Sequence, residues 1–268
     1  MRANEDALAA ELRSRHGVTT TKRLAALGIT KRSVEALVRQ GRLVRWRNGV
    51  LVSASSPDGL QHRMAIACAV TGGVVMFPTA GEVWNLRKTP RVPEVHVCID
   101  VSRRIVEPPG VRVHRARHLP DAHVVRRADG VNVTSPPRTA VDASTMLGRD
   151  DLESLIENGI DRGYFTLATV RHVATAAGGR GRPGGARLSA VLAARDPVRR
   201  PVRSDYELRL ERAMRRRGFP PLVREHRLEL SSGEVIHPDL GVPDDGVFIE
   251  AARSEECRAP RSCLTLLT

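Results

Sequence analysis

Hydrophobic positions recur with two different spacings in the first fifty residues of the chain. Up to residue 40 they recur every three or four positions, which is the spacing of helices with one buried face. Between residues 43 and 53 hydrophobic and polar residues alternate in two short runs, as in half-buried strands, and Asn48-Gly49 separates the runs. The pattern predicts three helices, over residues 4–15, 21–28 and 30–40, followed by a β-hairpin.

The third of these helices has the clearest division into two faces. Thr30 is placed to cap its N-terminus, and Gly41 stands where a helix commonly ends. Val34, Leu37 and Val38 form its apolar stripe. The remaining surface carries long hydrogen-bond donors and small residues: Lys31, Arg32, Ser33, Ala36, Arg39 and Gln40. Because arginine pairs with guanine edges or phosphates and glutamine with adenine, this surface is suited to the major groove of DNA.

The hairpin that follows adds positive charge beside this helix. Arg45 and Arg47 fall on one face of its first strand, and Val44 and Trp46 on the other. We expect Trp46 to be buried in the core, because it stands alone among aliphatic residues. A basic hairpin beside such a helix is typical of a winged helix-turn-helix, and the arginines would then hold phosphates. The alternative is a helix-turn-helix that binds another protein and leaves its charged face in solvent.

Charge supports the DNA interpretation through its location rather than its total. The chain carries a formal net charge of +13, but only three of its basic residues are lysines, and an arginine bias of this kind arises in GC-rich genomes without selection for binding. Residues 1–52 contain 11 Lys and Arg against 4 Asp and Glu, so more than half of the excess lies in a fifth of the chain.

There is no apolar run of 18 residues, and the four cysteines form no Cys-x-x-Cys pair, so we expect no membrane contact, no zinc ribbon and a cytoplasmic location.

Residues 57–196 alternate between helical and strand-like patterns, which predicts a compact α+β domain. His114 and His118 have the spacing of metal ligands on a helix, but they fall at a strand end before Pro120, so we expect exposed loop histidines rather than a metal site. Arg138 and Asp142 stand one helical turn apart and predict an ion pair.

The last block places three carboxylates on separate predicted elements. Glu207 lies on an amphipathic helix, Asp239 follows a hairpin, and Glu250 ends a strand-like run. Carboxylates that converge at the end of a sheet are typical of sites that hold a divalent metal for phosphodiester cleavage, so Asp239 and Glu250 are candidate Mg²⁺ ligands.

Two families resemble parts of this chain. Residues 18–52, through Gly28-Ile29-Thr30 and Arg47-Asn48-Gly49-Val50, resemble the winged helix of AbiEi-type antitoxins, which are transcriptional regulators of type IV toxin-antitoxin systems. The run SPPRTAVDAS at 135–144 resembles the domain that follows this winged helix in actinobacterial relatives. The resemblance implies a DNA-binding regulator of its own promoter and leaves a cognate toxin open.

The end of the chain resembles the start of a PD-(D/E)XK endonuclease domain of the very-short-patch-repair type. Glu207, Pro238-Asp239 and Glu250 match the family's motif, but Ala251 and Ala252 stand where the family has an acidic residue or lysine. We interpret residues 251–268 as an aberrant, disordered tail left by a frameshift or truncation, and any nuclease as inactive.

We therefore expect an α+β multidomain protein. Its predicted parts are a winged helix-turn-helix (1–56), an AbiEi-like α+β domain (57–196), a truncated endonuclease-like α/β domain of the restriction-endonuclease type (197–250) and the tail (251–268). The expected function is sequence-specific binding of double-stranded DNA without a cofactor, as a monomer or homodimer. A Mg²⁺-dependent endonuclease or nickase and a protein-binding module that does not contact DNA are the alternatives.

Overall fold

The computed structural model describes residues 2–117, 119–178, 182–195, 204–230, 232–251 and 264–267. The chain divides into two compact units, each described here by itself. Unit 1 comprises Met1–Met146 and Ala168–Gly185, and unit 2 comprises Leu147–Leu167 and Ala186–Thr268. Both units mix helices with sheets, so the expected α+β class is confirmed. Among the described residues, no helix is both long enough and apolar enough to cross a membrane.

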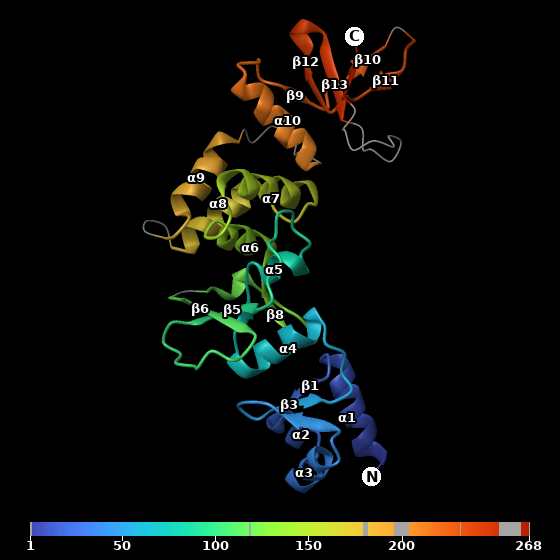
Figure 1. Ribbon diagram of the computed structural model, residues 1–268, viewed down its shortest axis with the longest axis vertical. Helices are drawn as coiled ribbons and strands as arrows, with labels where there is room; N and C mark the ends of the chain where they lie inside the picture. Colours follow the sequence, from blue (N-terminus) through green and yellow to red (C-terminus); the bar gives the residue numbers. More distant parts are fainter. Residues whose placement is uncertain are drawn as a thin grey trace. The chain divides into compact units, whose positions relative to one another are not determined.

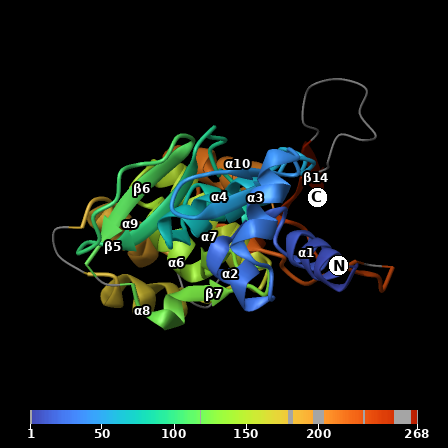
Figure 2. The same cartoon turned by 90° about the horizontal axis from the view of Figure 1, so that it is seen from below.

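Unit 1 begins with three helices and a small antiparallel sheet in the strand order β1-β3-β2. Thr20 caps α2 by accepting a hydrogen bond of 3.2 Å from the backbone N–H of Arg23, and Thr30 caps α3 in the same way through Ser33. The three blue helices gather beside this sheet in Figures 1 and 2. The elements are α1 (Arg2–Ser14), β1 (Val18–Thr20), α2 (Thr21–Ala26), α3 (Lys31–Arg39), β2 (Leu43–Arg45) and β3 (Val50–Ser53).

The two faces of this small sheet pack into two different cores. Leu51 of β3 faces the helices, and it is buried with Leu24 of α2 and Val34 of α3. Its neighbours Val50 and Val52 face the other way and join the core of the following domain. Because side chains alternate along a strand, one strand serves both cores and ties the N-terminal helices to the rest of unit 1.

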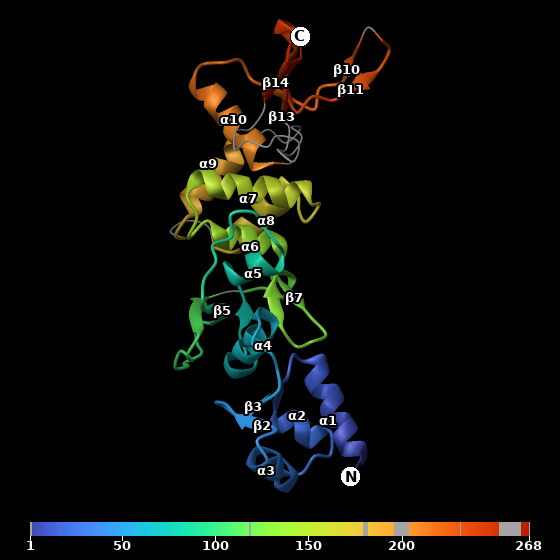
Figure 3. The ribbon, with the colours of Figure 1, turned by 45° about the vertical axis from the view of Figure 1, so that its right-hand side comes forward.

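The larger part of unit 1 is built on a mixed five-stranded sheet with the order β6-β5-β4-β8-β7, in which β5 and β6 run parallel. Figure 3 labels β5 and β7 of this sheet. Helix α4 contacts this sheet and also β1 and β3, and its Met64, Ala67 and Cys68 are buried. The elements are α4 (Leu60–Thr71), β4 (Val74–Val75), α5 (Thr79–Val83), β5 (Val95–Asp100), β6 (Val111–Ala116), η1 (Asp121–His123), β7 (Val124–Arg126), β8 (Asn132–Thr134), α6 (Pro136–Ala143) and α8 (Leu167–Ala176).

The described residues of unit 2 form three α-helices, a four-stranded antiparallel sheet in the order β14-β13-β12-β9 and the separate hairpin β10-β11. The elements are α7 (Arg149–Asp161), α9 (Gly185–Ala194), α10 (Asp205–Arg216), β9 (Val223–Arg224), β10 (Leu228–Glu229), β11 (Val235–Ile236), β12 (Leu240–Val242), η2 (Pro243–Asp245), β13 (Val247–Ala251) and β14 (Leu264–Leu267).

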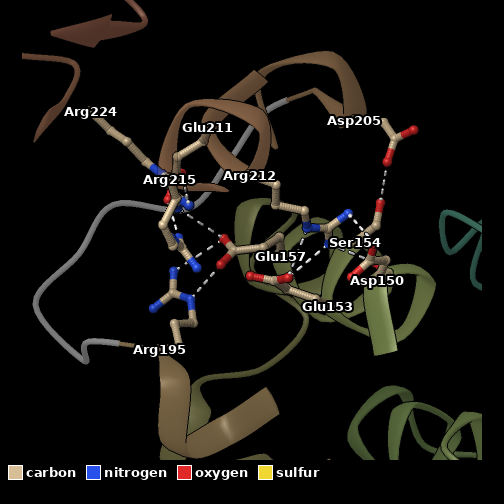
Figure 4. A network of polar contacts seen from close by, with 10 residues as sticks. All are labelled: Asp150, Glu153, Ser154, Glu157, Arg195, Asp205, Glu211, Arg212, Arg215 and Arg224. Carbon is tan, nitrogen blue, oxygen red and sulfur yellow. Dashed lines mark hydrogen bonds and ion pairs between the residues drawn. The ribbon is translucent and has the colours of Figure 1, made fainter. Parts of the chain in front are cut away.

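A buried network of ion pairs joins α7, α10 and β9 in unit 2 (Figure 4). Glu157 of α7 is 1% exposed and accepts a hydrogen bond of 2.7 Å from Arg195 Nε, while Arg224 of β9 lies 3.5 Å from its other oxygen. Arg224 also donates a hydrogen bond of 2.7 Å to Glu211 of α10. Charges this deeply buried are tolerated only when each is paired, so the network holds these elements in one arrangement.

The structure differs from the sequence prediction at the end of the chain. Within the stretch expected to be a disordered tail, Leu264–Leu267 form β14, which pairs antiparallel with β13. Ala251 continues β13 rather than beginning the tail. The remaining residues of that stretch, 252–263 and 268, lie outside the described residues.

Candidate nucleic-acid interface

Helix α3 exposes the polar surface that its sequence predicts. Val34 is 5% exposed, and Leu37 and Val38 pack against the same core, so the apolar stripe faces inward. The predicted DNA-contacting residues of the helix are exposed: Lys31, Arg32, Ser33, Arg39 and Gln40. The Ser33 hydroxyl lies 3.0 Å from the Thr30 hydroxyl and is therefore engaged in the N-terminal cap.

Four cations on this part of the surface have no hydrogen-bond or ion-pair partner among the described residues. Lys31, Arg32, Arg39 and Arg47 are exposed and form no hydrogen bond or ion pair through their side chains with any residue that the structure describes. Unit 1 contains other surface arginines that are paired, such as Arg23 with Glu11 at 2.6 Å. These four unpaired cations lie on α3 and the hairpin.

Arg45 differs from its neighbours, because Glu35 of α3 neutralises it. Arg45 Nη2 donates a hydrogen bond of 2.6 Å to Glu35 Oε1. This bond and the charge of Arg45 hold the pKa of Glu35 below its usual range, and the charges of Lys31 and Arg39 lower the pKa further. The sequence prediction placed Arg45 with Arg47 as a free phosphate contact and did not consider Glu35, whose partner lies ten residues further along the chain.

The turn of the hairpin has the geometry that Asn48-Gly49 predicts, with φ of 54° and 72°, as in a type I′ turn. Its tip does not project freely. Asn48 Nδ2 donates a hydrogen bond of 3.1 Å to the carbonyl of Val70 in α4. The Gly49 carbonyl accepts a hydrogen bond of 2.9 Å from the backbone N–H of Thr21. The hairpin is thus held at its tip, and strand β2 is its exposed edge.

Trp46 is not in the core, and the prediction that it would be buried is wrong. Its exposed fraction is 42%, and that of Val44 on the same strand face is 46%. The matching face of β3 is buried, since Val50 and Val52 pack with α4. β2 is the edge strand of the sheet, so no further strand flanks Val44 and Trp46 on its outer side among the described residues. Two apolar side chains therefore stand beside Arg45 and Arg47.

Unit 2 brings together the three carboxylates that the sequence singled out. Glu207 of α10 is 9% exposed, Asp239 directly precedes β12, and Glu250 lies on β13. The pKa of Glu250 is raised by burial and by the negative charges of Asp239 and Glu207, while the backbone N–H of Asp239 donates to it and partly offsets the rise. The three groups are therefore close enough to affect one another.

Two of these carboxylates, Asp239 and Glu250, are the Mg²⁺ ligands expected from the sequence. Within the described ranges, no group of three or more His, Cys, Asp and Glu side chains is placed to hold a metal ion. This finding concerns groups of three or more side chains, so the Mg²⁺ site expected at Asp239 and Glu250 stays a prediction.

The histidines of the central sheet contact one another. His114 lies on β6 and is partly buried, so the prediction of an exposed loop residue is wrong; His118 lies outside the described residues. His114 Nε2 is 3.0 Å from Nδ1 of His96 on the parallel strand β5, and the rings stack with centroids 5.0 Å apart. Burial, and secondly the charge of His114, lower the pKa of His96 to about 4.

The ion pair predicted between Arg138 and Asp142 is confirmed. Arg138 Nε donates a hydrogen bond of 3.0 Å to Asp142 Oδ1, and both side chains are buried. Arg182 donates a hydrogen bond of 2.5 Å to the same oxygen, and this bond joins the segment after α8 to α6. The arrangement gives these residues a structural role in unit 1.

Comparisons with known proteins place the chain in no family. No family model and no curated protein matches the sequence. Among solved structures, the crystal structure of the RV2827C protein from Mycobacterium tuberculosis is similar with a TM-score of 0.43 and 17% identity, over 73% of this chain and 82% of that chain.

Proposed function

We propose that this protein binds double-stranded DNA through α3 and strand β2 and acts as a transcriptional regulator. The observation that carries the proposal is the group of four exposed cations, Lys31, Arg32, Arg39 and Arg47, none of which has a counter-charge within ion-pair distance among the described residues. DNA phosphates would supply that charge, and their neutralisation releases counterions, which is the main source of affinity for DNA.

The order of elements supports a winged helix-turn-helix. Three helices and three strands follow one another as α1-β1-α2-α3-β2-β3, and the sheet order β1-β3-β2 sets the β2-β3 hairpin beside α3. In this proposal α3 enters the major groove, where Arg32, Arg39 and Gln40 face base edges. Lys31 and Arg47 hold the phosphate strand, and Arg45 joins them only when it leaves Glu35.

The resemblance to AbiEi-type antitoxins favours control of the protein's own promoter. A winged helix that is firmly attached to a second domain is suited to a repressor, because α4 and the hairpin tip hold the DNA-facing elements in one orientation. The toxin partner that such regulators accompany is not required for this step.

Selection from a pool of random duplexes, followed by fluorescence anisotropy on the selected site, tests the proposal. We expect Arg39→Ala to lower the preference for the selected site over a scrambled duplex by about ten-fold or more, because a base contact is worth about 1–3 kcal/mol. Arg47→Ala should weaken both duplexes to a similar extent and reduce the salt dependence by about one phosphate contact.

The matched control is Arg91→Ala, which removes an exposed arginine of unit 1 that lies outside α3 and the hairpin. It should leave both affinities unchanged. Binding that does not depend on salt, or an Arg39→Ala variant with unaltered site preference, would contradict the proposal.

The second candidate is a DNA endonuclease in unit 2, favoured by the proximity of Glu207, Asp239 and Glu250. Incubation of supercoiled plasmid with Mg²⁺ is the test, and Asp239→Asn is the variant to compare. Nicking that Asp239→Asn abolishes would put this candidate first, whereas plasmid that stays supercoiled would exclude it.

A further inference from the structure

A groove with a volume of about 860 Å³ lies in unit 1 between α1 and the segment that joins β3 to α4. The volume is within the range of small-molecule sites in proteins, about 300–1,000 Å³. Its walls are largely apolar, with leucines from three elements and small residues from the joining segment: Leu8, Leu12, Leu43, Ala54, Pro57 and Leu60. None of these residues belongs to the proposed DNA-contacting surface.

The ionisable residues that line the groove are all basic. Arg13, Arg42 and two histidines, His16 and His62, line it, and no acidic residue is among the lining residues. Arg13 is exposed and makes no ion pair with any part of the chain that the structure describes. Arg42 lies 3.5 Å from Glu5, but both side chains are more than half exposed, so that pair contributes little.

Both histidines of the groove have hydrogen-bond partners in the fold. His62 Nδ1 donates 2.6 Å to the carbonyl of His16, which leaves Nε2 of His62 available to a ligand. His16 Nε2 lies 2.9 Å from Asp129, outside the lining. The charge inside the groove is therefore positive and set by arginines that have no strong structural partner.

We propose that this groove binds a small anionic amphiphile, a molecule with an apolar chain or ring system and one carboxylate or sulfonate. The apolar walls bury the body of the ligand, and Arg13 with Arg42 pairs with its acidic head. A neutral apolar molecule would leave the arginines without a counter-charge, and a compact polyanion would leave the leucines in water.

The groove also reaches the connection between α3 and β2, which gives its occupancy a route to DNA binding. Gly41 and Arg42 belong to that connection, and they line the groove together with Leu43, the first residue of β2. The backbone of Arg42 is held on both sides, by a 3.0 Å bond from its N–H to Leu37 of α3 and a 3.1 Å bond from Ala54 to its carbonyl. The coupling that we propose is that a ligand paired with Arg42 acts through these two bonds on the position of α3 relative to β2. This coupling rests on the proposed function, whereas the ligand site does not.

Two probes of the expected chemistry test the site in the full chain: anilinonaphthalene sulfonate, followed by its fluorescence, and dodecanoate, followed by displacement of that dye. We expect saturable binding of the dye at one site and its release by dodecanoate. Ala54→Trp places a large side chain in the groove from an exposed position and should abolish binding. Arg13→Gln should weaken dodecanoate by about three- to ten-fold.

Arg91→Gln is the matched control for Arg13→Gln, since Arg91 is an exposed arginine of unit 1 away from the groove. It should bind both probes like the original protein, and circular dichroism should show all variants folded. Equal dye binding by Ala54→Trp, unaltered dodecanoate binding by Arg13→Gln, or no saturable binding of either probe would overturn the site. A dimer that Ala54→Trp converts to monomer in sedimentation would overturn it in favour of a second copy in the groove.

DNA binding measured with and without dodecanoate separates the coupling from the proposed function. We expect dodecanoate to change the Kd for DNA several-fold in the original protein and not in Ala54→Trp. Binding of the probes with unaltered DNA affinity would overturn the coupling alone. A protein that binds the probes but no DNA would contradict the proposed function and leave the ligand site supported.

Discussion

Glu35 on α3 and Arg45 on β2 form a 2.6 Å hydrogen-bonded ion pair in which both side chains are a little under half exposed. The pair lies on the surface proposed to meet DNA, where Glu35 is the acidic residue of a helix that otherwise carries Lys31, Arg32 and Arg39. A carboxylate at this position repels phosphates and keeps Arg45 from them. Under the proposed function, the pair would therefore set how much positive charge the surface offers to DNA.

Replacement of Glu35 by Gln is expected to strengthen non-specific DNA binding by about three- to ten-fold. The substitution removes one negative charge and releases Arg45, so the slope of log K against log salt should steepen by about one phosphate contact. Arg45→Ala alone should have a small effect, and it should cancel the gain when combined with Glu35→Gln. Anisotropy titrations at three salt concentrations, on the two single variants and the double variant, check this prediction. A gain in DNA affinity that persists in the double variant would show that Arg45 does not take part.

Trp46 is expected to report DNA binding by its fluorescence. The chain has two tryptophans, so Trp84→Phe leaves Trp46 as the single emitter. Emission from a side chain that is 42% exposed should lie at long wavelength and be quenched by acrylamide. Duplex DNA should reduce that quenching, and Trp46→Ala should weaken binding by about five-fold or more, since aromatic contacts with nucleic acid are worth about 1–3 kcal/mol.

The matched control for Trp46→Ala is Val101→Ala, which removes another exposed apolar side chain of unit 1. It should leave DNA affinity unchanged. Short-wavelength emission from Trp46 in the free protein would mean that the hairpin edge is covered, contrary to the structure.

Much of the N-terminal fold was predictable because its signals are local. Thr20 and Thr30 cap helices within three residues of their partners, and Asn48-Gly49 determines a turn by its own backbone preferences. The division of α3 into two faces follows from its period alone. Boundaries of this kind depend on residues that are close in sequence.

What could not be predicted depends on partners far along the chain. Strands of two or three residues, such as β1, β4 and β8, have no measurable period, and they exist because a neighbouring strand pairs with them. The exposure of Trp46 follows from the edge position of β2, and the pairing of Arg45 follows from the hairpin folding back on α3. Alternation along the strand predicts which residues share a face but not whether another element covers that face.

Acid is expected to destabilise unit 1 through His96. Its pKa is lowered from 6.5 to about 4 in the folded state, so between these values the unfolded chain binds a proton that the folded chain does not. Stability should therefore fall as pH drops from about 7 to about 4, by up to about 3 kcal/mol from this residue. His96→Asn should flatten the difference between urea unfolding at pH 7.5 and 4.5. His172→Asn, which changes an exposed histidine of α8, should not.

Glu157 is expected to be the residue on which unit 2 depends most. Its carboxylate is 1% exposed and pairs with Arg195 and Arg224 (Figure 4). Glu157→Gln keeps the shape but leaves two buried guanidinium groups without that charge, so we expect a loss of about 3–5 kcal/mol. Because the chain has two compact units, hydrogen exchange measured by peptide is the suitable probe, and the loss should be confined to peptides of α7, α10 and β9.

The control for Glu157→Gln is Glu229→Gln, which breaks an exposed 3.2 Å pair with Arg227 and should cost less than about 1 kcal/mol. Equal protection in the two variants would mean that the buried network does not hold these elements together.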